Sequence, residues 1–190
     1  MKQAESAVPR PDDVYFFATC VVDQFFPGPG MDAITLLERE GIRVHFPEEQ
    51  TCCGQPAYTS GFPDEARKVA AHQLTLFPND WPVVVPSGSC AGMMKHHYPT
   101  LFAADPVRKA QAEALSARIY ELTDFLVNVL NFQPEDKGSD CTVVLHTSCS
   151  ARREMGVHLT GRKLLGGLGK VTVAQQDHES ECCGFGGTFS

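Results

Sequence analysis

The residues of this chain most able to do chemistry are its eight cysteines, seven of which fall into two matched groups. These seven are Cys20, Cys52, Cys53 and Cys90 in the first group, and Cys149, Cys182 and Cys183 in the second. In each group a single cysteine precedes a vicinal pair that is followed by glycine. The interval between them is 32 residues in the first group and 33 in the second. Thiolates bind iron–sulfur clusters and zinc, so the repeated spacing predicts two related thiolate sites.

The segments around the first group predict alternating strands and helices. The expected strands are 13–18, 42–46 and 83–85, and the expected helices are 31–40 and 63–77, with a Gly/Pro loop at 27–30. This alternation is typical of a parallel sheet whose strands are joined by crossover helices. The first part of the chain is therefore predicted to be an α/β fold.

The same pattern restarts after a region predicted to be helical at 106–131 and a polar linker at 133–140. The second part is predicted to contain a strand at 142–146, a helix at 151–168 and a strand at 171–174. We therefore expect an α/β protein of two pseudo-symmetric Rossmann-like halves with parallel sheets. The expected halves are residues 1–132, with the connecting helices, and residues 133–190, of which the second is truncated.

The predicted strand ends explain how distant cysteines could form one site. Cys20, Cys53 and Cys90 each follow a predicted strand, and ligands bind beyond the carboxyl ends of the strands in open α/β sheets. Neighbouring glycines, such as Gly54, leave room for the backbone to approach a cluster. We interpret the seven cysteines as ligands of an iron–sulfur cluster. Cys141 lies outside the repeat and is expected to be a packing residue.

Two other interpretations of the cysteines stay open. Structural zinc sites usually show paired Cys-x-x-Cys motifs, and this chain contains none. The vicinal pair Cys52–Cys53 could instead form a strained and therefore reducible disulfide.

Composition narrows the class of protein. The formal net charge of −7 argues against nucleic acid as a partner, because no basic surface would neutralise the phosphates. No apolar run reaches the roughly 20 residues that a membrane span requires. The first residues lack the apolar segment of a secretory signal, so we expect a cytoplasmic protein. A reducing cytosol disfavours structural disulfides and favours a metal or redox role for the cysteines.

Longer strings around the cysteines resemble a known family. They are TCCGQPAYTSG (51–61), PSGSC (86–90), ELTDF (121–125), LHTSC (145–149) and CCGFGGTFS (182–190). Over about 13–190 the chain is similar to the lactate utilisation protein A family, whose cysteine-rich "CCG" domain occurs twice per chain. Related domains occur in the heterodisulfide reductase B subunit and in the glycolate oxidase iron–sulfur subunit.

The resemblance implies a component of an oxidoreductase complex of the L-lactate dehydrogenase type, rather than a complete enzyme. It would act as an iron–sulfur electron-transfer subunit in the oxidation of lactate to pyruvate, with a [4Fe–4S] cluster. The implied partners are a ferredoxin-like iron–sulfur subunit and a third lactate-utilisation subunit. The alternatives are a heterodisulfide- or glycolate-type redox subunit, and a non-redox assembly scaffold whose cysteines bind zinc or no metal.

Two departures from the family pattern modify this expectation. The wider motif ends in Cys-x-x-Cys, whereas Met93 stands here at the place of its last cysteine, which leaves four cysteines in the first group. The chain also ends seven residues after Cys183, before any equivalent of the third strand. We therefore expect the second site to be incomplete and its cluster to be absent from this chain.

Overall fold

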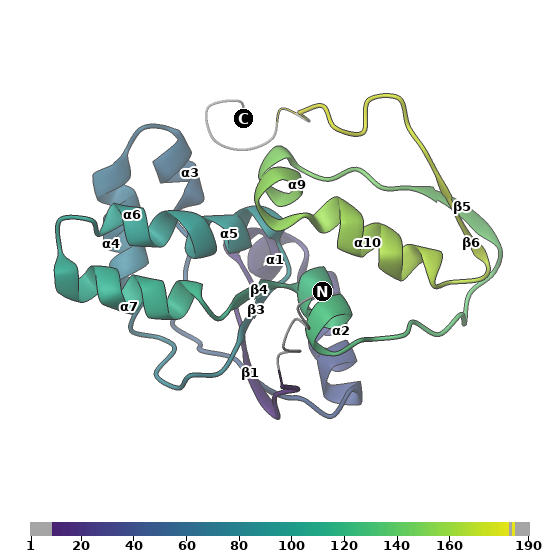
Figure 1. Ribbon diagram of the computed structural model, residues 1–190, viewed down its shortest axis with the longest axis horizontal. Helices are drawn as coiled ribbons and strands as arrows, with labels where there is room; N and C mark the ends of the chain where they lie inside the picture. The colour runs from purple at the N-terminus through teal and green to yellow at the C-terminus, as the bar shows by residue number, and fades with distance from the viewer. Residues whose placement is uncertain (1–8, 183, 185–190) are drawn as a thin grey trace, which may run out of the picture.

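A four-stranded parallel sheet forms the centre of the protein in the computed structural model, which describes residues 9–182 and 184 (Figure 1). Its strands are β1 (Asp13–Phe16), β2 (Arg43–His45), β3 (Val83–Val85) and β4 (Ile119–Glu121). The strand order is β2-β1-β3-β4, and each neighbouring pair is parallel. The predicted α/β class with parallel sheets is confirmed.

The sheet buries both faces of its central strands, which is why residues 14–16 of β1 and the three valines of β3 are apolar without interruption. Because side chains alternate along a strand, Val14, Phe16 and Val84 enter one core. Tyr15 and Val83 enter the other core, on the opposite face. All of these side chains are buried.

Helices cover the two faces in the manner of a doubly wound fold. On the Phe16 face lie α2 (Pro27–Arg39) and the π-helix η2 (Phe125–Val129), with the short α1 (Cys20–Phe25) and α8 (Leu122–Asp124) beside them. The Tyr15 face carries α3 (Gln55–Thr59), α4 (Pro63–Gln73), α5 (Gly88–Gly92), the π-helix η1 (Met93–His97), α6 (Tyr98–Leu101) and α7 (Pro106–Ser116). The connections that follow β1 and β3 therefore leave the sheet on opposite faces.

The prediction of one helical region at 106–131 was wrong, because α7 ends at Ser116 and β4 follows. The apolar spacing of this segment fits a helix, but Ile119 pairs with Val83 at the open edge of β3. Ladder hydrogen bonds and burial of Ile119 outweigh the local helical pattern. The predicted loop at 27–30 was also wrong, since α2 already begins at Pro27, where a missing N–H costs nothing.

The second part of the chain repeats the first arrangement on a smaller scale. Strands β5 (Cys141–Val144) and β6 (Val171–Ala174) pair in parallel, and α9 (Cys149–Met155) and α10 (Val157–Gly166) lie between them in sequence. The helix predicted at 151–168 is divided because Gly156 adopts a left-handed conformation with φ +65°. No helix or strand forms at 131–140. We propose that the boundary between the halves lies within that segment.

The two halves meet where α5 crosses α9 (Figure 1). A Cβ atom added at Gly88 would lie 2.4 Å from the Cβ of Ala151, so glycine is what allows this approach. A second link is the hydrogen bond of 2.6 Å between the hydroxyls of Thr123 and Thr160, which joins α8 to α10. Among the described residues, no helix combines the length and the apolar character that crossing a bilayer requires.

Candidate functional site

Two cysteines of the first group stand at the point where the sheet changes its winding direction. Cys20 opens α1 just after β1, and Cys90 lies in α5 just after β3. Strands β1 and β3 are neighbours whose connections leave on opposite faces, and in doubly wound sheets such a switch point forms a crevice beyond the carboxyl ends of the strands. Doubly wound sheets bind their ligands in this crevice.

The vicinal pair reaches the same place from the loop after β2. Gly54 has φ +85°, and its N–H donates to the sulfur of Cys52 over 3.4 Å. A Cβ atom at Gly54 would also lie 3.3 Å from the carbonyl oxygen of Ala66, so this turn requires glycine on two counts. The Tyr98 hydroxyl, itself buried, donates to the carbonyl oxygen of Cys53 over 2.9 Å. One hydrogen bond therefore holds the Cys52 sulfur and another holds the Cys53 carbonyl.

The four side chains of the first group form a connected series of thiols. Cys20 interacts with Cys52, Cys52 with Cys53, and Cys53 with Cys90. Cys53 is the deepest of the four at 1% exposure, and the other three are half-buried. The structure therefore brings together four sulfur atoms from positions that span 70 residues of sequence.

Hydrogen bonding and burial divide these thiols into two kinds. The Cys53 thiol and the Gly54 N–H lower the pKa of Cys52 to about 5. The Cys53 thiol also lowers the pKa of Cys90, with further help from the Ser87 and Ser89 hydroxyls. The pKa of Cys53 is raised well above its ordinary value, first by its bond with Cys52 and then by its contact with Cys90 and by burial.

Cys20 belongs with Cys53, because burial and the neighbouring Cys52 raise its pKa to about 11. Two thiols with a lowered pKa, Cys52 and Cys90, therefore alternate along the series with two whose pKa is raised, Cys20 and Cys53. A bound cation or cationic cluster centre would favour the deprotonated form of all four.

Four thiols are a donor set of the kind that a zinc ion or an iron–sulfur cluster binds. Within the described residues, no three His, Cys, Asp or Glu side chains are grouped so as to hold one metal ion. A tetrahedral zinc site places four ligands around one ion, whereas the four cysteines of a [4Fe–4S] site are spread over the cluster. The thiols of the first group interact in successive pairs rather than as a group around one point. Met93 is fully buried in the same core cluster as Cys53.

The second group repeats part of this geometry. Cys149 opens α9 just beyond β5, and Cys182 interacts with it, as Cys52 does with Cys20. The Gly184 N–H donates to the Cys182 sulfur over 3.4 Å, and Gly184 has φ +77°, so Gly184 repeats the conformation and the hydrogen bond of Gly54. The Gly184 N–H and Cys149 lower the pKa of Cys182. Cys183 lies outside the described residues.

Comparison with known proteins gives two kinds of match. A family model described as a cysteine-rich domain matches residues 14–95 and 143–190, which contain both cysteine groups. Lactate utilization protein A of Geobacillus kaustophilus (strain HTA426) is 43% identical over 93% of this chain and 74% of its own length. Lactate utilization protein A of Shouchella clausii (strain KSM-K16) is 44% identical over 94% of this chain and 74% of its own length. This chain belongs to the lactate utilization protein A family.

Membership in the lactate utilization protein A family confirms the resemblance noted from the sequence strings. The chain spans about three quarters of the length of these two relatives. The two matched segments begin within β1 and β5, so the family's cysteine-rich domain coincides with the repeated strand and helix arrangement.

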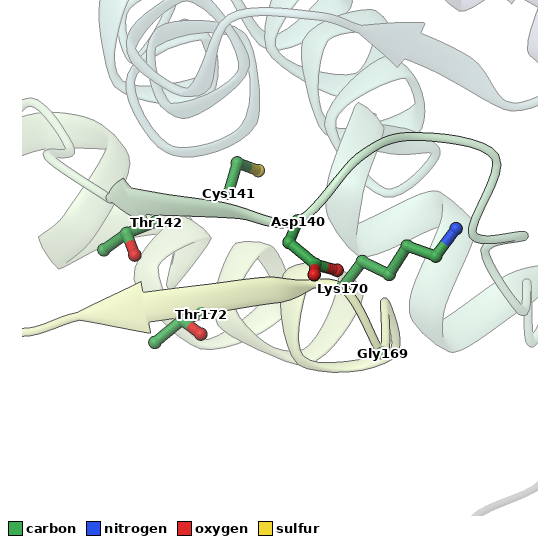
Figure 2. A pocket seen from close by; sticks show the side chains of 6 residues that line it. All are labelled: Asp140, Cys141, Thr142, Gly169, Lys170 and Thr172. Carbon is green, nitrogen blue, oxygen red and sulfur yellow. The ribbon is translucent and has the colours of Figure 1, made fainter.

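Cys141 stands apart from both groups. It is exposed at the start of β5, so its predicted packing role was wrong. Together with Thr142 and Thr172 it lines an open hollow of about 510 Å³ over the edge of the small sheet (Figure 2). An exposed thiol outside the two cysteine groups is a useful control for experiments on the other seven.

Sequence reasoning did not single out the polar side chains that hold the thiol loops. Tyr98, Ser87 and Ser89 contact the first group but carry no spacing signal of their own. The buried Gln73 donates to the Thr51 hydroxyl over 2.7 Å, next to the vicinal pair. A fully buried glutamine was not visible from composition, since only the fold shows that it faces the core.

Proposed function

We propose that this chain is an iron–sulfur electron-transfer subunit of a system that oxidises L-lactate to pyruvate. The observation that carries the proposal is the convergence of four cysteine thiols at the winding change of the sheet. The name of the relatives supports lactate as the compound whose use the system serves. A cytoplasmic location fits the same proposal, because the reducing cytosol keeps such thiols available as ligands.

The first group supplies a complete set of protein ligands. Cys20, Cys52, Cys53 and Cys90 would hold a [4Fe–4S] cluster, which supplies one-electron redox chemistry when bound. The Gly54 N–H would stabilise the charge on the Cys52 sulfur, and the two serine hydroxyls would do the same for Cys90. In the second half, Cys149 and Cys182 would contribute to another site together with Cys183.

The chemistry of lactate oxidation explains why partners are needed. Conversion of lactate to pyruvate releases two electrons and two protons, whereas an iron–sulfur cluster carries electrons singly. A ferredoxin-like iron–sulfur subunit and a third lactate-utilisation subunit are therefore proposed as partners. In this arrangement the chain is a component of an oxidoreductase complex.

Two alternatives remain, one of a different functional class and one that differs only in its substrate. A non-redox assembly scaffold would use the cysteines to bind zinc, or would leave them without metal. A redox subunit of the heterodisulfide or glycolate type would keep the cluster and change the substrate.

The test is the metal content of the chain after anaerobic purification, measured as iron, acid-labile sulfide and zinc per chain. The proposal predicts iron and sulfide in equal amounts, about four of each per complete site. Cys90→Ser is expected to lower both, while the control Cys141→Ser leaves them unchanged. Stoichiometric zinc, or no metal before and after reconstitution with iron and sulfide, would favour the scaffold.

A further inference from the structure

The side chain of Gln50 joins the two loops that carry Cys20 and the vicinal pair. Its amide oxygen accepts a hydrogen bond from the Ala18 N–H over 2.8 Å. Its amide nitrogen donates to the carbonyl oxygen of Phe16 over 3.2 Å and to that of Pro47 over 2.9 Å. One half-buried side chain therefore satisfies backbone groups on both sides of the gap between β1 and β2.

The register of the two strands explains why a side chain is needed here. Tyr15 pairs with His45, so continuing the parallel ladder by two residues would place Phe17 opposite Pro47. In a parallel ladder, the residue opposite Phe17 donates its N–H to the carbonyl of Phe16 and accepts from the N–H of Ala18. Proline has no N–H and cannot complete this pairing. The Gln50 amide makes both bonds in its place.

This substitute pairing lies next to the thiol series. Ala18 precedes Cys20 by two residues, and Gln50 precedes Cys52 by two residues. The thiols of Cys20 and Cys52 interact with each other, so the Gln50 amide and this thiol pair connect the same two loops.

The second half contains one bond of the same kind. The Gln176 amide nitrogen donates to the carbonyl oxygen of Leu145 over 3.2 Å. Leu145 precedes Cys149 by four residues, as Phe16 precedes Cys20 by four, so the two carbonyls occupy equivalent places. Gln176 lies nearer to its strand than Gln50 does, which means that two different positions supply the same bond.

We propose that Gln50 is a positioning residue that sets the separation of Cys20 from Cys52 and thereby the readiness of the first site to take up its metal. The effect on metal uptake rests on the proposed function. The effect on the two thiols does not, since it concerns the chain alone.

The test compares Gln50→Met, which keeps the length of the side chain and removes its hydrogen bonds, with the parent and with Gln111→Met on the exposed surface of α7. The reduced, metal-free proteins are treated with dibromobimane, which joins two nearby thiols. Peptide mapping then gives the yield of the link between Cys20 and Cys52. Melting temperature is measured in parallel, and iron uptake is measured after incubation with iron and sulfide.

The expected result is a Cys20–Cys52 link at least about fivefold rarer in Gln50→Met, because the loss of even one of the two hydrogen bonds that join the loops would have that effect. The Gln111→Met control should match the parent, and both variants should melt as cooperatively as it does. An unchanged link in folded Gln50→Met would overturn the inference, whatever the iron content.

A rarer link in Gln50→Met, combined with a parent that takes up no iron, would support the positioning role and contradict the proposed function. If Gln50→Met does not fold, Gln50→Glu is measured instead. It keeps the acceptor for the Ala18 N–H and loses the donors for the carbonyls of Phe16 and Pro47. A rarer Cys20–Cys52 link in Gln50→Glu would support the positioning role of Gln50, and an unchanged link would overturn it.

Discussion

The close crossing of α5 and α9 makes Gly88→Ala a sensitive test of how the halves fit together. The new Cβ would lie 2.4 Å from the Cβ and 2.8 Å from the Cα of Ala151, and 3.0 Å from Cγ2 of Val157. Because one of these atoms belongs to the α9 backbone, rotation of a side chain cannot relieve the overlap. The two helices have to move apart.

The expected cost follows from two opposing effects. Overpacking of a filled interface costs about 1–3 kcal/mol of unfolding free energy. Replacing glycine by alanine in a helix returns up to about 1 kcal/mol. The cost of the overlap is the larger of the two effects, so we expect a net loss of about 1–2 kcal/mol of unfolding free energy. For a chain of this size, that loss lowers the melting temperature by roughly 2–8 °C.

Urea unfolding of the metal-free protein measures this difference, with the slope of the transition checked for a change in the unfolded state. Gly138→Ala is the matched control, because no atom lies within 4 Å of its added Cβ. It should stay within about 0.5 kcal/mol of the parent. Combining Gly88→Ala with Ala151→Gly should cost less than the sum of the single changes. A strictly additive double variant, or a Gly88→Ala protein as stable as the parent, would refute the packing argument.

Three further predictions concern charge and capping. Arg43 and His45 hold the pKa of Asp13 well below its usual range, so Asp13 stabilises the fold fully above about pH 4 and progressively less as acid protonates it. Asp13→Asn should therefore lower the melting temperature more at pH 7 than near pH 2, and equal losses at both would contradict the ion pair. Burial raises the pKa of Glu121, so the contribution of this side chain to stability falls as pH rises above about 4.5. In urea unfolding, Glu121→Gln should therefore be less destabilising at pH 7 than at pH 4, and the reverse order would count against burial as the cause. The Asp105 side chain caps α7, so Asp105→Ala should cost about 1 kcal/mol of unfolding free energy, and no change in calorimetry would show that the cap is redundant.

Much of the fold follows from local pattern, because the strands that carry the site are short apolar runs that end in loops. The strand at 83–85 was predicted with its observed bounds, since three consecutive valines fit a strand buried on both faces. Strand β4 was missed because the spacing of Ile119 among its apolar neighbours also fits a helix. Pairing with β3, which decides the matter, is a long-range contact that no local window contains.

Some residues of the candidate site could be predicted from the sequence and others could not. The cysteines could be found from their spacing, because the chain repeats the interval. Gln50 could have been found only by combining the strand register with Pro47, since the proline removes a donor that the ladder needs. The helix α5 was not expected, because the glycines around Cys90 are poor helix formers, and it forms where α9 packs against it.

The contact between Gly88 and Ala151 bears on how the two halves can change over generations. Copies of a duplicated unit usually drift apart independently, but here a larger residue at position 88 demands a smaller one at position 151. Because each position lies within two residues of a cysteine, drift at this contact would also displace the thiols. The residue types at positions 88 and 151 are therefore expected to covary among relatives, so that a substitution in one half is accompanied by a substitution in the other.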